Sequence, residues 1–186
     1  MTATTMNIGK VRFSYVHVWE PDSIDGGDGK YSVSLIIPKS DKALVAKIQA
    51  CIENAYKQGV GKFGGKLPTI WKNPLRDGDA ERGEDEAYKG CYFINASSQR
   101  KPGVYKLPKP VRLITDQEEF YSGCYGFANV GFFAFNTNGN KGVACGLNHV
   151  LKTADGDYLG GRMSGEAAFN DADIPDTYDD FPGDDL

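Results

Sequence analysis

The chain contains 186 residues, of which 40% are hydrophobic and 25% are charged, a composition sufficient for one globular domain with a buried core. The net charge of −4 is uneven: the 21 residues from Glu166 onward hold eight of the 25 acidic residues and no Lys or Arg, which leaves 17 acidic and 21 basic residues in 1–165. No apolar run approaches the roughly 18 residues that span a bilayer, and the N-terminus lacks the apolar region of a signal peptide, so we exclude a membrane protein and expect a cytoplasmic one.

Two strands and a long loop are expected at the start of the chain. Apolar residues alternate through 10–19, with Val11, Phe13 and Tyr15 on one face, which is typical of a strand with one buried side. A Gly- and Asp-rich segment follows, and residues 30–37 repeat the alternation. These two strands are therefore expected to form a hairpin.

One helix is expected directly after the second strand. Ser40 can act as its N-cap by accepting a hydrogen bond from an early backbone N–H, and Gly59 suits the position after its last turn. An apolar stripe recurs between them at helical spacing, formed by Leu44, Ile48, Cys51, Ile52 and Ala55. With this stripe the helix is expected to pack onto the sheet.

The rest of the chain predicts loops and further strands. Residues 59–90 are rich in Gly, Pro and charge and indicate long loops, with at most one short strand over 67–72. Further strands are expected at 91–97, 111–114, 123–137 and 142–153, the last two joined by an Asn-Gly turn. Because one helix cannot provide the crossovers of a parallel sheet, we predict a mainly β, OB-fold-like antiparallel barrel over 1–165, with a β-sandwich as the alternative. Residues 166–186 cannot bury enough apolar surface to fold, so we expect a disordered acidic tail.

Two stretches without acidic residues combine basic and aromatic side chains. One lies between Lys57 and Arg76 and the other between Ala87 and Thr115. Basic residues neutralise phosphates, and aromatic faces stack on unpaired bases without reading their sequence, although any single ring can instead belong to the core. We therefore predict a single-stranded-DNA-binding surface formed by Trp19, Lys62, Phe63, Lys66, Trp71, Lys72, Arg76, Tyr88, Tyr92, Arg100, Lys101, Tyr105, Lys106 and Lys109.

The acidic tail, 166–186, carries isolated apolar residues between its aspartates. Such a segment can mimic DNA electrostatically and occupy a basic face of its own chain. It can also dock into a pocket of a partner protein. A purely solubilising role is the alternative.

An acidic stretch, 77–86, offers the best candidates for catalysis. Asp77, Asp79 and Glu81 could hold Mg²⁺ in a nuclease, since carboxylates are its preferred protein ligands. Their spacing does not fit an EF-hand, and the chain contains no phosphate-binding loop, no nucleophile motif and no zinc-type cysteine spacing. We expect no enzyme, metal or cofactor, and four reduced thiols; the nuclease and an adaptor protein whose body does not touch DNA stay open as alternatives.

Several segments resemble the phage single-stranded-DNA-binding proteins, a family formerly described only as a domain of unknown function. They are KYSVSLIIPK (30–39), NPLRDGD (73–79), YKGCYFINASSQRKPGV (88–104) and KGVACGLNHVL (141–151), and the resemblance covers most of 7–165. It implies an OB fold, single-strand binding in phage DNA replication and recombination inside the bacterial host, and an acidic tail that contacts replication and recombination proteins; a homo-oligomer is compatible with it. On this chain the tail role would fall on Asp179, Asp180, Phe181, Asp184, Asp185 and Leu186. Related tails often end in an aromatic residue, whereas this chain ends in Leu186.

Overall fold

The computed structural model describes residues 3–22 and 29–159, together with residues 169, 175 and 177. The partner-docking residues predicted in the tail lie outside the described residues. The elements of the described part are β1 (Thr5–Asp22), β2 (Lys30–Pro38), α1 (Lys42–Gln58), the 3₁₀ turn η1 (Gly59–Gly61), β3 (Arg76–Asp77), α2 (Gly78–Glu81), the 3₁₀ turn η2 (Glu86–Tyr88), β4 (Cys91–Ser98), β5 (Gly103–Lys106), β6 (Arg112–Leu113), β7 (Tyr125–Thr137) and β8 (Asn140–Ala154).

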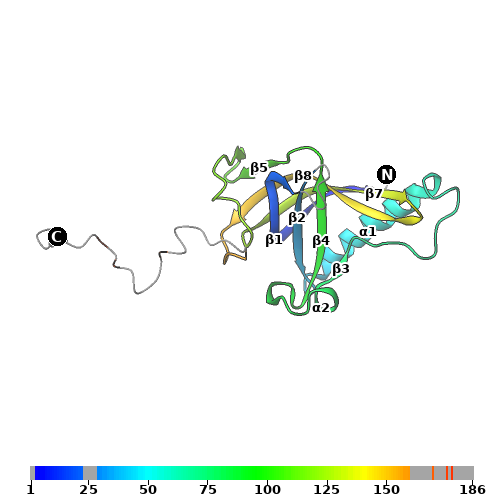
Figure 1. Cartoon of the computed structure of the whole chain (residues 1–186), viewed down its shortest axis with the longest axis horizontal. Helices are drawn as coiled ribbons and strands as arrows, with labels where there is room; N and C mark the ends of the chain where they lie inside the picture. Colours follow the sequence, from blue (N-terminus) through cyan, green and yellow to red (C-terminus); the bar gives the residue numbers. More distant parts are fainter. Residues whose placement is uncertain (1–2, 23–28, 160–168, 170–174, 176, 178–186) are drawn as a thin grey trace, which may run out of the picture.

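Five strands form a barrel in the order β4-β2-β1-β7-β8, and a pairing between β4 and β8 closes it (Figure 1). The short strands extend the sheet, since β3 pairs with β4, β5 with β8 and β6 with β5. The prediction of an OB-like barrel with one helix after the second strand is confirmed. The barrel is mixed, because β4 and β5 run parallel to β8. The parallel pairing of β4 with β8 needs no crossover helix, because the long stretch of chain from β4 through β7 connects the two strands.

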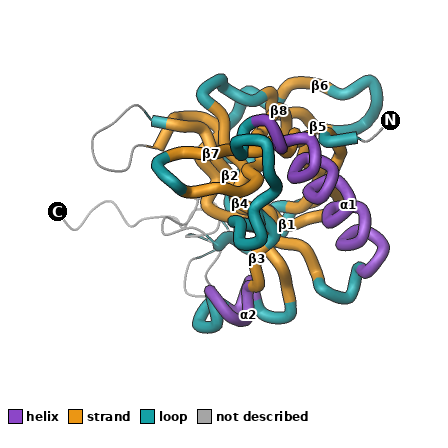
Figure 2. The backbone as a smooth tube through the Cα atoms, turned by 90° about the vertical axis from the view of Figure 1, so that its right-hand side faces the viewer, coloured by secondary structure: helices purple, strands orange, loops and turns teal. Residues whose placement is uncertain are grey.

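Alternating side chains and one helix face form the core. Val11 and Phe13 of β1 and Leu35 of β2 point inward and are at most 1% exposed. The predicted stripe of α1 is buried against β1, β7 and β8, and the helix lies along one side of the barrel (Figure 2). The N-cap is Asp41 rather than Ser40, since the Asp41 side chain accepts from the Leu44 backbone N–H.

The turn between β7 and β8 follows the prediction from its sequence. Asn138 has a φ of 51° and Gly139 a φ of 81°. Both values lie in the left-handed region that a two-residue hairpin turn requires and that Asn and Gly adopt most readily. The short strand expected over 67–72 is reduced to an isolated bridge between Lys72 and Gly142.

All four cysteines are free thiols, as expected. Burial raises the pKa of Cys124 to about 11 and also raises the pKa of Cys145, so both stay protonated at neutral pH. None of the helices in the described part of the chain has the length and apolar character needed to cross a membrane.

Candidate nucleic-acid interface

The outer face of β1, β2 and β4 is the first candidate. In OB barrels the second and third strands, with the loops at their ends, form the surface that takes oligonucleotides. Small polar side chains form its floor here: Ser32 and Ser34 of β2 pair with Ser97 and Asn95 of β4, and His17 of β1 pairs with Ser32. A depression of about 160 Å³ lies over this floor. The floor therefore leaves room for a ligand that makes hydrogen bonds.

Tyr15 projects from this floor. The β1–β2 register shifts between Ser14 and His17, and Tyr15 has a φ of 47°, which is uncommon for a bulky residue. Simple alternation predicts Tyr15 on the core side beside Phe13. The bulge instead turns its ring outward and leaves it 50% exposed. An exposed ring at this position can stack on an unpaired base.

Arg82 lies over the same ring. Its guanidinium carbon is 5.0 Å from the centre of the Tyr15 ring, and its Nη1 donates to the Tyr15 hydroxyl at 3.4 Å. The guanidinium also lies 5.2 Å from the Tyr88 ring and 5.0 Å from the Phe93 ring. Its Nε is buried and has no hydrogen-bond partner among the described residues. Three aromatic rings therefore hold the Arg82 guanidinium in position, and not all of its N–H donors are engaged by the described residues.

Tyr88 anchors the segment that carries Arg82. It is fully buried, packs edge-on against Phe93 and donates a hydrogen bond to Ser34 Oγ at 2.9 Å. Burial raises the pKa of Tyr88. Because its ring is enclosed, the expectation that Tyr88 stacks on DNA is corrected. The same correction applies to Phe63, which is 3% exposed and packs beside Tyr56.

Three carboxylates of the acidic stretch, 77–86, are paired with cations of the protein. Lys39 Nζ lies 2.7 Å from Asp77 Oδ1 and 2.8 Å from Asp79 Oδ2, and these hydrogen bonds lower the pKa of both carboxyls. Glu81 forms an ion pair with Arg76. No group of three potential metal ligands occurs among the described residues. The carboxylates proposed for a nuclease are thus engaged by cations of the protein.

One group of predicted residues gathers at the β7–β8 hairpin. Trp71 is half-buried and stacks on Tyr56 with ring centres 4.6 Å apart. The Lys72 backbone N–H donates to the Lys141 carbonyl and the Lys72 carbonyl accepts from the Val143 N–H, so Lys72 pairs with β8 on either side of Gly142. Lys62 and Lys66 are exposed nearby in the chain. This segment therefore lies beside the β7–β8 hairpin.

A second group lies near the far ends of β1 and β4. Lys101 Nζ is 5.7 Å from the Trp19 ring, and the Trp19 indole donates to the Phe120 carbonyl at 3.2 Å. Arg100 is exposed in the same connection after β4. The half-buried indole thus has part of its ring beside Lys101, which forms no ion pair with any residue that the structure describes.

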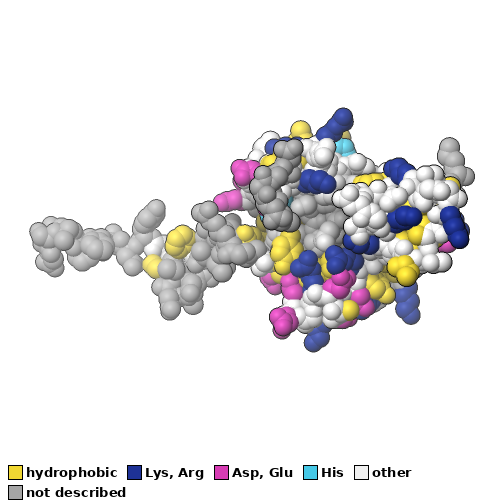
Figure 3. Space-filling view, turned by 45° about the vertical axis from the view of Figure 1, so that its right-hand side comes forward, with side chains coloured by type: hydrophobic (Ala, Val, Ile, Leu, Met, Phe, Trp, Pro, Cys, Tyr) yellow, Lys and Arg dark blue, Asp and Glu magenta, His cyan; other side chains and the backbone are white. Residues whose placement is uncertain are grey.

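The remaining predicted residues are not among those that line the depression over the floor. Tyr92 packs on the core side of β4, and Arg76 lies over Phe93 with its charge paired. Tyr105 lies on β5 with its ring 5.8 Å from the His149 ring, and Lys109 is exposed in the loop after β5. Figure 3 shows Lys and Arg side chains around a hollow on one side of the molecule, with Asp and Glu mainly at its lower edge.

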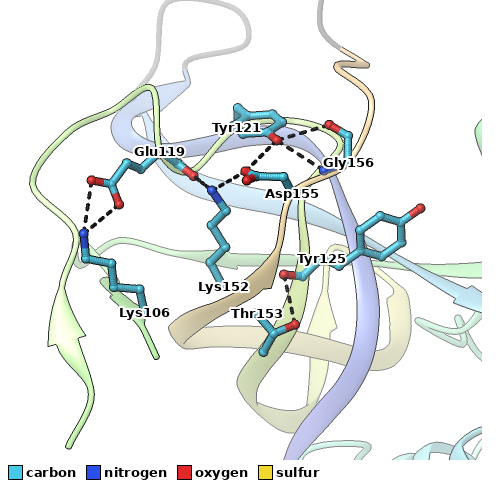
Figure 4. Close-up of polar contacts among 8 residues, drawn as sticks. All are labelled: Lys106, Glu119, Tyr121, Tyr125, Lys152, Thr153, Asp155 and Gly156. Carbon is cyan, nitrogen blue, oxygen red and sulfur yellow. Dashed lines mark hydrogen bonds and ion pairs between the residues drawn. The ribbon is translucent and has the colours of Figure 1, made fainter. Parts of the chain in front are cut away.

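Lys106 belongs to a polar network at the end of β8 (Figure 4). Its Nζ lies 2.9 Å from Glu119 Oε2. Lys152 donates to the Glu119 carbonyl and pairs with Asp155 at 2.6 Å, while the Tyr121 hydroxyl donates to Asp155 at 2.9 Å. The charge of Lys106 is therefore largely compensated within the protein.

Leu159 lies close to the rings that Arg82 contacts. The backbone N–H of Leu159 donates to the Ser122 carbonyl at 2.8 Å. The Leu159 side chain packs against a buried cluster of Ile36, Tyr88 and Phe93. Leu159 therefore lies next to the β1–β2–β4 face.

Sequence comparison connects this barrel to phage proteins. Residues 4–181 match the family described as Enterobacter phage Enc34, ssDNA-binding protein. The p50 protein of Acyrthosiphon pisum secondary endosymbiont phage 1 is 33% identical over 178 residues, which cover 89% of this chain and 92% of p50.

Solved structures share the fold. The single-stranded DNA-binding protein from bacteriophage Enc34, in complex with ssDNA, superposes with a TM-score of 0.75 at 24% identity, covering 84% of this chain and 90% of that chain. The single-stranded DNA binding protein gp2.5 of bacteriophage T7 superposes with a TM-score of 0.57 at 17% identity, with the same coverage of 84% and 90%. With the sequence match over nearly its whole length, the chain belongs to the Enc34-type family of phage single-stranded-DNA-binding proteins, which bind DNA and are not enzymes.

Proposed function

We propose that this protein binds single-stranded DNA, with little regard to base sequence, along the outer face of β1, β2 and β4. The observation that carries the proposal is the exposed ring of Tyr15 beside the guanidinium of Arg82. A base stacks on the ring while the guanidinium contacts a neighbouring phosphate. Because every base has an aromatic face, such contacts tolerate any sequence.

Basic residues in two connecting segments guide the DNA backbone. Lys62, Lys66 and Lys72 lie near the β7–β8 hairpin, and Arg100 and Lys101 lie in the connection after β4, with Trp19 beside Lys101. None of these five cations forms an ion pair within the described part of the chain, so each is available to a phosphate. Each phosphate contact on a single strand contributes about −0.7 to the slope of log affinity against log salt.

The acidic tail restrains this binding and recruits partners. Leu159 packs against Tyr88 and Phe93 beside Arg82, which supports competition between the acidic tail and DNA for the same cations. Asp179, Asp180, Phe181, Asp184, Asp185 and Leu186 supply the charge and the apolar contacts for replication and recombination proteins. Such a protein would act in phage or prophage DNA replication and recombination in the host cytoplasm.

A fluorescence titration with oligo-dT tests the proposal, with Trp19 and Trp71 as reporters. The full-length protein and a truncation ending at Gly165 are compared at about 50 and 200 mM salt. Binding that weakens with salt and tightens on truncation supports both the face and the tail. Lys47→Gln on the exposed side of α1 serves as the control and should leave the salt slope unchanged. No binding by either form at low salt would refute the proposal.

A further inference from the structure

A second outward face of the barrel carries a row of apolar and aromatic side chains across four strands. Phe127 of β7 pairs with Leu151 of β8, Leu151 pairs with Tyr105 of β5, and Tyr105 pairs with Leu113 of β6. Their chain neighbours point into the core, as the burial of Val104, Ala128 and Val150 shows. The four therefore share the solvent side of the sheet.

Three aromatic rings on this face lie across glycines. A Cβ atom at Gly9 would lie 1.9 Å from the Phe127 ring, and one at Gly103 would lie 2.5 Å from the Tyr105 ring. Phe133, further along β7, lies over Gly146 in the same manner. A Cβ atom at Gly146 would lie 3.5 Å from the Phe133 ring.

Rings in this position cover the sheet on one side and can offer the other side to solvent. Phe127 is 37% and Phe133 is 48% exposed. Covering a glycine stabilises the sheet, and a buried ring would do this equally well. The outward rings in addition provide a surface on which unpaired bases can stack.

Side-chain amides fill the space between the rings. Asn129 Nδ2 donates to Asn7 Oδ1 at 2.7 Å, and Asn148 Nδ2 donates to Asn129 Oδ1 at 2.9 Å. This chain of hydrogen bonds holds the three amides in place and leaves further donor and acceptor positions open. The face thus offers hydrogen-bonding groups as well as rings.

Cations surround the rings. Lys62 Nζ is 5.9 Å from the centre of the Phe133 ring. Arg112 is exposed on β6 beside Leu113, and Lys109 is exposed in the adjoining loop. Within the described residues none of these three has an acidic partner. A neutral aromatic centre with cations around it is complementary to the bases and phosphates of a single strand. It is less complementary to an uncharged protein surface.

We propose that the outer face of β7, β8, β5 and β6 is a second contact path for single-stranded DNA. It rests on the proposed function and extends it: a strand bound on the β1–β2–β4 face continues past Arg100 and Lys101, in the connection from β4 to β5, onto Tyr105, Phe127 and Phe133. Long strands therefore use both faces, whereas short strands use the first face alone.

Two oligo-dT strands, one of about 6 and one of about 20 nucleotides, distinguish the two paths. These lengths are chosen around the range of OB-fold site sizes. The test variant is the double substitution Phe127→Leu with Phe133→Leu, which keeps an apolar cover on the glycines but removes both aromatic faces. Tyr15→Gly is the matched variant of the first face. Circular dichroism confirms the fold of each.

The double leucine variant should lose at least about fivefold in affinity for the long strand and none for the short one. Tyr15→Gly should weaken both. Unchanged binding of both lengths by the double leucine variant would overturn the second path while leaving the first intact. The second path would also be overturned if the double leucine variant bound DNA normally but changed its mass in sedimentation without DNA. That result would assign the face to a protein partner. Failure of the unaltered protein to bind either length would refute the proposed function itself.

Discussion

The guanidinium of Arg82 lies 5.0 Å from the centre of the exposed Tyr15 ring, although the two residues are far apart in the sequence. A bulge in β1 turns Tyr15 outward, and the buried Tyr88 holds the segment that carries Arg82. The pair unites the two elements of single-strand binding, a ring for a base and a cation for a phosphate.

Replacing Tyr15 by Gly should weaken single-strand binding by about 1–3 kcal/mol, the contribution of one stacked base. The free energy of unfolding should change by less than about 1 kcal/mol, because glycine relieves the left-handed φ while losing the contact with Arg82. Fluorescence titration and urea unfolding measure the two effects. Tyr15→Phe keeps the ring and should bind normally; equal weakening by both substitutions would argue against stacking.

Replacing Arg82 by Gln should remove one phosphate contact. The slope of log affinity against log salt should become shallower by about 0.7. Titrations at several salt concentrations measure this slope. Lys62→Gln should have the same effect. Lys106→Gln should have a smaller one, because Lys106 is paired with Glu119. A larger loss for Lys106 than for Arg82 would contradict the assignment.

Sequence patterns predicted the barrel because its strands alternate and its helix has a single apolar stripe. They missed Tyr15, since alternation assigns it to the core and only the bulge reverses its direction. They missed Arg82 because it lies within the acidic stretch, 77–86, so its charge is outweighed by neighbouring carboxylates in the sequence. In irregular segments no periodicity distinguishes inward from outward rings, so Phe63 and Tyr88 were assigned to the surface.

Replacing Tyr88 by Phe should destabilise the fold without a direct effect on DNA. The substitution leaves the buried Ser34 hydroxyl without the donor that lies 2.9 Å away, at a cost of about 1 kcal/mol in unfolding free energy. Urea unfolding measures the loss. If DNA affinity fell sharply while stability stayed constant, Tyr88 would be a binding residue and not a core residue.

The ion pairs of Lys39 make a pH-dependent contribution. Lys39 lowers the pKa of Asp77 and Asp79 below the ordinary value of 3.8. A lowered carboxyl pKa in the folded state stabilises the protein above the unfolded value, and this stabilisation is lost as the pH falls through the folded pKa. Lys39→Met should therefore be less stable than the unaltered protein at neutral pH, and the difference should shrink below about pH 4. Urea unfolding across pH provides the measurement; a difference that persists at low pH would show that packing of Lys39 on Tyr92 dominates.

Photo-crosslinking of iodouridine-substituted single-stranded DNA, followed by peptide mass spectrometry, tests the central claim most directly. The account predicts a crosslink to Tyr15, which disappears in the Tyr15→Gly variant, together with protection of Arg82 from guanidinium-specific modification. Crosslinks confined to α1, with Tyr15 unmodified and Arg82 equally reactive with and without DNA, would contradict it.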